Sequence, residues 1–320
     1  MFQVDQIPFF KYLHTSKRIL LAGAGGGFDI FTGIPIYFAL TALGKEVTLA
    51  NLSFTDLSRT NSELLFNACY KVQANDRLID GGDYFPEKVL CQWFAHQGIP
   101  LSVYAFRKTG VRPLRDAYKQ IARIHGIDTV ILMDGGTDSL MFGNEESLGT
   151  PHEDICSMAA AFRSGITHQF LLSIGFGIDH FHGVSHYRFL ENVALLAKEG
   201  GYLGMWQLMK EMSEAKKFLS AVEFANEKVS SRPSIVCNSI ASALEGNYGD
   251  VHFSGRTAGS SLWINPLMAA YWAFDLRKVI ERIEYYPLIK DTNSMSELSG
   301  LLQDYRSNLK SKRAHIQLPI

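Results

Sequence analysis

Residues 18–29 read Arg18-Ile19-Leu20-Leu21-Ala22-Gly23-Ala24-Gly25-Gly26-Gly27-Phe28-Asp29, an apolar run that ends in a glycine-rich turn. A nearly uninterrupted apolar run of this kind is typical of a strand buried on both faces of a parallel sheet. Glycine at the carboxyl end of such a strand lets backbone N–H groups approach a ligand closely. The stretch therefore predicts a strand, a turn and a ligand site at one edge of an α/β sheet.

Two further strand-like runs end in the same way. Residues 129–133 lead into Asp134-Gly135-Gly136-Thr137-Asp138, and residues 169–174 lead into Gly175-Phe176-Gly177-Ile178-Asp179-His180. Parallel strands bring their carboxyl ends to the same edge of a sheet. We therefore expect the three turns to line one shared pocket.

The rest of the chain alternates between strand-like and helix-like patterns. Strands are expected at 18–24, 46–52, 101–107, 129–133 and 169–174, and helices at 30–43, 113–125, 151–163, 187–198 and 234–245. A late strand is expected at 279–286, and a small, charged helical cover at about 202–232. This order predicts a Rossmann-like α/β fold, with a mostly parallel sheet flanked by helices, in a single domain over residues 1–320.

The composition and net charge of the chain indicate which kinds of molecule it can bind. The chain has 320 residues, of which 47% are hydrophobic and 20% charged, and its net charge is −1. A nearly neutral chain has no general attraction to nucleic acid or to an anionic membrane. No apolar segment reaches the roughly 20 residues that span a bilayer. We therefore expect a small-molecule, anionic ligand, with neither nucleic acid nor membrane as partner; a homo-oligomer stays open.

The cysteines and the two ends of the chain indicate the cellular compartment and the character of the C-terminal tail. The four cysteines form no metal-ligand or disulfide spacing, and the first residues lack the pattern of a secretion signal. These features predict a cytoplasmic protein. The only basic run, Lys310-Ser311-Lys312-Arg313, is expected to be a solvated tail.

The first glycine turn matches a dinucleotide fingerprint only in part. The third small position is occupied by Phe28, and the second strand ends near Asn51 rather than at an acid, which disfavours NAD(P). Backbone N–H groups of such a turn still favour phosphate or carboxylate. An anion is therefore expected to bind at Gly23, Gly25, Gly26, Gly27 and Asp29. The alternative is a tight turn in which Asp29 only caps a helix.

The second turn carries two carboxylates, Asp134 and Asp138, four residues apart. They are expected to bind hydroxyl groups or to act as acid and base, with Gly135, Gly136 and Thr137 contacting the ligand. A divalent metal such as Mg²⁺ or Mn²⁺ is an alternative, as is a plain capping role. The acids that follow, at 145–146 and 153–154, are expected mostly to face solvent or to cap helices.

The third turn leads into a segment rich in histidine. In an extended segment His180 and His182 would point the same way, and histidine titrates near neutral pH. We expect His180 to move protons with Asp179 as its orienting partner, and His182 to contact ligand; hydrogen bonding to backbone is the alternative. Arg256, in a loop of Gly, Ser and Thr, is a further candidate for an anion.

Together these motifs resemble a family of archaeal and bacterial proteins that is known as a domain of unknown function. The resemblance rests on Gly23–Asp29, on Asp134–Leu140 with Gly149–Asp154 downstream, and on Asn265-Pro266-Leu267, and it spans about 18–275. It implies no activity, so the functional prediction rests on the residues.

The residues favour an enzyme of hydrolase or transferase type that acts on a nucleotide-like or phosphorylated small metabolite. Catalysis is assigned to Asp134, Asp138, Asp179 and His180. Two alternatives stay open. One is an NAD(P)-dependent oxidoreductase, and the other is a regulatory protein that binds a nucleotide or metabolite without catalysis.

Overall fold

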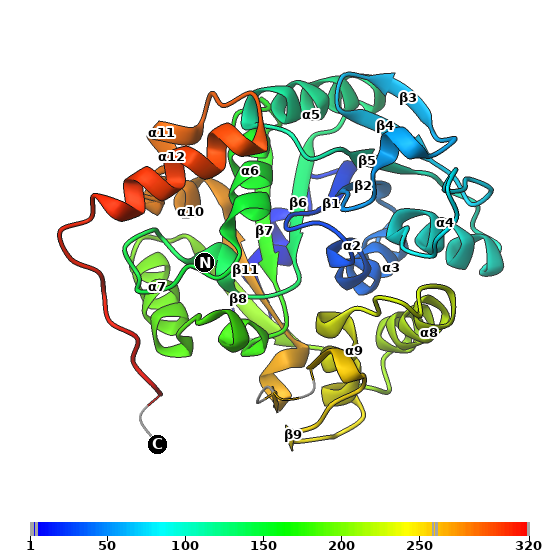
Figure 1. The fold of residues 1–320 in the computed structure, drawn as a ribbon. Helices are drawn as coiled ribbons and strands as arrows, with labels where there is room; N and C mark the ends of the chain where they lie inside the picture. Colours follow the sequence, from blue (N-terminus) through cyan, green and yellow to red (C-terminus); the bar gives the residue numbers. More distant parts are fainter. Residues whose placement is uncertain (1–2, 4–5, 258, 260–261, 319–320) are drawn as a thin grey trace.

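Strands of the computed structural model, which describes residues 3, 6–257, 259 and 262–318, build one large sheet (Figure 1). Its members are β1 (Arg18–Gly23), β2 (Glu46–Leu52), β3 (Glu63–Phe66), β4 (Cys69–Val72), β5 (Val103–Phe106), β6 (Thr129–Asp134), β7 (His168–Ser173), β8 (Tyr202–Gln207) and β11 (Ala270–Asp275). Their order across the sheet is β3-β4-β5-β2-β1-β6-β7-β11-β8. Two short strands, β9 (Gly249–Asp250) and β10 (Trp263–Ile264), form a separate antiparallel pair.

The centre of the sheet is parallel and its margins are antiparallel. Strands β5, β2, β1, β6 and β7 pair in parallel, whereas β4 and β11 run against their neighbours in the parallel block. The apolar runs explain the centre, because β6 is buried along its whole length and β1 along all but its first residue. The expected α/β fold with a mostly parallel sheet and flanking helices is confirmed.

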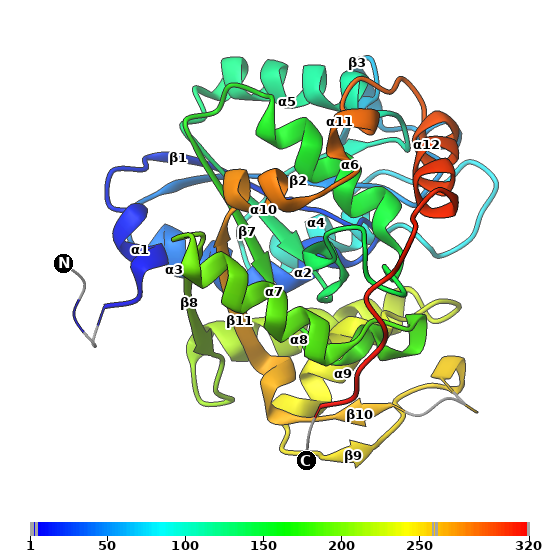
Figure 2. The same cartoon turned by 90° about the vertical axis from the view of Figure 1, so that its left-hand side faces the viewer.

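Helices cover both faces of this sheet (Figures 1 and 2). Leu20 and Ala22 of β1 pack toward one face, and Ile19 and Leu21 toward the other, as the two-residue period of a strand requires. The first face packs against α5 (Val111–His125), α6 (Pro151–Phe162), α7 (His186–Lys198), α10 (Leu276–Arg282), α11 (Tyr286–Ile289) and α12 (Met295–Ser307). The second packs against α1 (Pro8–Tyr12), α2 (Asp29–Thr32), α3 (Ile34–Ala42), α4 (Pro86–His96), α8 (Ser213–Lys228) and α9 (Ile235–Leu244).

Three expected elements differ from the structure. The helix expected at 30–43 is divided into α2 and α3 at Gly33, two residues before Pro35. The expected helical cover begins as a strand, β8, and only its later part is the helix α8. The late strand expected at 279–286 is wrong, because α10 occupies residues 276–282 after Asp275 caps its first N–H groups.

The basic run is solvated in part: Lys310, Ser311 and Lys312 are exposed, as expected, whereas Arg313 is partly buried. Arg313 donates to the carboxylates of Glu145 and Glu191, and Glu145 is almost completely buried. Glu145 in turn accepts hydrogen bonds from the backbone N–H groups of Phe142 and Gly143. The C-terminal segment therefore holds the loop between β6 and α6 in place, and Glu145 does not face solvent.

Membrane-spanning helices were not expected. Among the described residues, no helix combines the length and the apolar character that crossing a bilayer requires.

Candidate functional site at the switch point of the sheet

The candidate site lies beside β1, where the chain changes from adding strands on one side of this strand to adding them on the other. From β1 the chain continues to β2 and β5 on one side, and then returns to β6 and β7 on the other side of β1. In open α/β sheets the loops after two such strands separate, and the crevice between them is where ligands bind. The first two glycine turns follow β1 and β6, so both lie at this crevice.

The first glycine turn already binds an anion from its own chain. The Gly25 N–H donates to Asp29 Oδ2 over 2.7 Å, and the Gly27 N–H donates to the carbonyl of Leu52 over 3.1 Å. Gly26 and Gly27 have φ values of +94° and +60°, which favour glycine. The turn thus holds the Asp29 carboxyl group of its own chain; binding of a ligand anion by Gly23 to Gly27 stays a prediction.

In the second turn Asp134 and Asp138 have different partners. Asp134 Oδ2 accepts hydrogen bonds from the hydroxyls of Ser139 and Ser173, the latter over 3.0 Å. Asp138 Oδ2 accepts from the backbone N–H of Thr150 over 2.8 Å and from its hydroxyl over 3.1 Å. Asp138 therefore holds the start of α6, whereas Asp134 keeps its other oxygen for further contacts.

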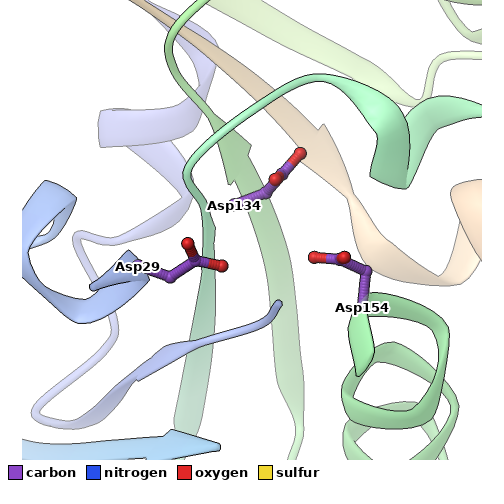
Figure 3. A group of neighbouring side chains, drawn as sticks. All are labelled: Asp29, Asp134 and Asp154. Carbon is purple, nitrogen blue, oxygen red and sulfur yellow. The ribbon is translucent and has the colours of Figure 1, made fainter. Parts of the chain in front are cut away.

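Three carboxylates converge at the crevice (Figure 3). Asp29 follows the first turn, Asp134 ends β6, and Asp154 lies in the first turn of α6. One oxygen from each lies within 4.8 Å of the others. Such a spacing of carboxylate oxygens suits a divalent cation.

Burial raises the pKa of each of these three carboxyl groups. The pKa of Asp29 rises to about 7, although the Gly25 N–H opposes the rise. For Asp134 and Asp154 burial lifts the pKa well above its ordinary value, and the nearby Asp138 carboxylate adds to the effect. Without a cation, the site thus strongly disfavours full ionisation.

The pKa values of two neighbouring acids, Asp138 and Asp179, are raised as well. Burial raises the pKa of Asp138, and burial followed by the charge of Asp138 raises that of Asp179. Asp179 accepts the backbone N–H of Thr137 over 2.6 Å. A methyl group on Gly136 would lie 2.6 Å from Asp179 Oδ2, so the second turn needs glycine for this close approach.

The third turn separates the two histidines. Residues Ile178–His182 form a 3₁₀ turn and not the expected extended segment, so His180 and His182 do not project in the same direction. His182 lines the cavity described below, whereas the His180 ring lies against the rings of His186 and His315. Asp179 hydrogen-bonds to Thr137, and the part of the chain that the structure describes shows no such bond to His180.

A cavity of about 670 Å³ opens at Asp29, whereas Asp134 and Asp154 are not among the residues that line it. Asp29, Asp179 and Gly26 line it, and cations and aromatic rings form its wall. This size is typical of small-molecule sites. The wall includes Phe28, Phe54, Tyr84, Phe181, Lys108, His182, Arg232 and Arg256.

Several of these residues were missed in the sequence. Asp154 was interpreted as an acid at a helix start, and Lys108, Arg232 and Tyr84 were not considered. For Asp154 a signal was present: a helix that begins after the loop of β6 directs its first turn back toward the strand ends. The other three come from loops that the topology folds over the crevice, which no local pattern reveals.

Comparison with models of protein families gives a match over most of the chain. A family model described as "Protein of unknown function (DUF1152)" matches residues 20–306. The sequence matches no curated protein.

Proposed function

The chain belongs to the DUF1152 family of proteins of unknown function, and we propose that it is an enzyme of hydrolase or transferase type. Its substrate is a phosphorylated or nucleotide-like small metabolite that binds in the cavity at the carboxyl ends of β1 and β6. One observation carries this proposal: cations and aromatic rings line the same cavity whose floor is acidic.

The cationic wall fits a phosphate. Arg232 and Arg256 line the cavity, and neither makes an ion pair with an acid among the residues described. Lys108 lines it too and pairs with Glu153 over 2.7 Å. Arginine recognises phosphate through two parallel hydrogen bonds, which makes both arginines suitable anchors.

The aromatic wall fits a base or another flat group. Phe54 and Phe181 are exposed large apolar side chains at the cavity, and Tyr84 also lines it, with Arg232 over its ring. Aromatic faces stack on nucleobases regardless of sequence. This wall favours a nucleotide-like substrate over a bare sugar phosphate.

The proton-transfer role predicted for His180 moves to His182 in this proposal. His182 lines the cavity, and its ring can reach a bound ligand.

All four cysteines are free and buried, which fits a cytoplasmic enzyme.

Binding and turnover of a nucleotide panel test the proposal. AMP, ATP, ribose 5-phosphate and NAD⁺ are titrated by calorimetry, and phosphate release is measured for the first three. We expect AMP or ATP to bind, and Arg232→Ala and Arg256→Ala each to weaken binding about tenfold or more. Arg123→Ala, an exposed arginine near the opposite edge of the sheet, is the matched control.

The same panel separates the alternatives. His182→Ala should lower turnover about 100-fold, and His180→Ala tests the assignment made from sequence. Binding of NAD⁺ alone would favour the oxidoreductase. Binding of nucleotides without turnover of any would favour the regulatory protein, and the enzyme proposal would be wrong.

A further inference from the structure

The three converging carboxylates bring negative charge together in a small volume. Asp29, Asp134 and Asp154 bring oxygens within 4.8 Å of one another. In the part of the chain that the structure describes, none of the three makes an ion pair with lysine, arginine or histidine. Buried charges in proteins are normally paired or coordinate a metal.

Asp154 adds an independent observation. Its side chain is only 4% exposed, and its Oδ1 is buried without a hydrogen-bond partner among the described residues. Figure 3 shows this carboxylate directed toward Asp29 and Asp134. An unsatisfied buried carboxylate oxygen costs free energy unless something binds it, so the oxygen points to a missing ligand.

We propose that Asp29, Asp134 and Asp154 bind one divalent cation of the Mg²⁺ or Mn²⁺ class. All three donors are carboxylate oxygens, the ligands that hard cations prefer, and the group contains no cysteine or histidine that would favour zinc. This inference goes beyond the proposed function, because cation binding does not require any particular substrate.

The surrounding hydrogen bonds orient two of the ligands. Asp29 Oδ2 is held by the Gly25 N–H, and Asp134 Oδ2 by the hydroxyl of Ser173. In each case the bond fixes the direction of the carboxylate, as partners of metal ligands commonly do. Asp154 Oδ1 has no such partner among the described residues, and we assign this oxygen to the cation.

The position also links the cation to the cavity. Asp29 lines the cavity and belongs to the carboxylate group, so a cation bound there lies at the cavity floor. Arg232 and Arg256 line the wall of the same cavity. A phosphate between them would meet positive charge on both sides, which is how magnesium sites usually engage phosphorylated ligands.

Direct titration with Mn²⁺ tests the proposal without any substrate. The full chain is treated with chelator, desalted, and titrated with Mn²⁺ while free Mn²⁺ is followed by electron paramagnetic resonance. We expect one Mn²⁺ per chain and its displacement by Mg²⁺. Asp134→Asn and Asp154→Asn keep the side-chain shape and should each weaken Mn²⁺ binding at least about tenfold.

The matched control is Glu87→Gln, which neutralises another completely buried acid outside the group. It should bind Mn²⁺ like the wild-type protein. Melting temperatures in chelator verify that both Asp→Asn variants fold.

Three outcomes would overturn the inference: no Mn²⁺ bound by wild type at millimolar concentration, unchanged binding in both Asp→Asn variants, or displacement by Zn²⁺ but not by Mg²⁺. Failure here leaves the proposed function standing, since the calorimetric nucleotide titrations are a separate measurement. Conversely, Mn²⁺ binding without nucleotide binding would reject the proposed function alone.

Discussion

At the scale of single residues, Gly25 connects the turn to the carboxylates. A methyl group on Gly25 would lie 2.7 Å from both Asp154 Oδ1 and Asp29 Oδ2, closer than side chains tolerate. Gly25 does not have a positive φ, so the requirement for glycine is one of space alone. The site therefore depends on a missing side chain as much as on those present.

Gly25→Ala should consequently displace both carboxylates and lower Mn²⁺ affinity at least about tenfold, with a loss of about 1–3 kcal/mol in unfolding free energy from overpacking. Gly300→Ala is the control, because Gly300 lies in α12 with open space around it. Titration and denaturant unfolding measure both effects. Wild-type Mn²⁺ affinity in Gly25→Ala would show that the carboxylates can move aside without cost.

Residue patterns predicted part of this site. The sequence predicts Asp29 and Asp134 because each adjoins a glycine turn at the end of an apolar strand, a combination that marks the edge of a parallel sheet. Asp154 was overlooked because an acid in the first turn of a helix normally has a capping or dipole role. His180 was preferred to His182 because an extended segment was assumed where the chain makes a 3₁₀ turn.

At the scale of elements, the C-terminal segment fixes the loop that leads into α6. Arg313 is about a quarter exposed, whereas the Glu145 side chain is 2% exposed. Glu145 also accepts an N–H from the amide of Asn192, so it is the centre of a buried polar network. Removing one partner of such a network leaves an uncompensated charge.

Arg313→Met should therefore cost about 3 kcal/mol of unfolding free energy, and the double variant with Glu145→Gln should recover part of that loss. The exposed pair of Lys278 and Glu281 provides the control, since Lys278→Met should change stability by less than about 0.5 kcal/mol. Urea unfolding of all variants checks this cycle. A loss in Arg313→Met no larger than in the control would contradict it.

The burial of an element decides whether the sequence predicts it. Strands β1, β2, β6 and β7 lie in the middle of the sheet, where continuous apolar runs are required. The short strands β3 and β4 lie at one margin and were missed, because β3 has no fully buried residue, β4 is buried only at its two ends, and their pattern is weak. The β-branched residues Val279 and Ile280 suggested a strand, yet they pack in α10 against the helical layer.

At the scale of the whole molecule, one buried acid should influence how stability depends on pH. Glu87 is completely buried, and its carboxylate accepts a hydrogen bond from the Asn51 amide over 2.8 Å. Burial raises the pKa of Glu87 from 4.5 to about 7. The folded protein therefore holds a proton there that the unfolded chain releases between these pH values.

Because the folded protein binds this proton more tightly than the unfolded chain does, stability falls as the pH rises. The contribution of Glu87 to the unfolding free energy is present at low pH and is lost as the pH rises toward 7. The loss is about 3 kcal/mol by linkage. Glu87→Gln cannot ionise, so its unfolding free energy relative to wild type should increase by about this amount between pH 5 and pH 8. Urea unfolding in chelator at both pH values measures it, and parallel pH profiles for the two proteins would refute it.

The strand order has a consequence for how the molecule is made. Strand β11 inserts between β7 and β8, although β8 precedes it in the chain by more than sixty residues. A ribosome therefore releases residues 202–207 long before their only neighbour in the sheet exists. During that interval this aromatic segment presents an unsatisfied edge, and the completion of the sheet waits for residues 270–275.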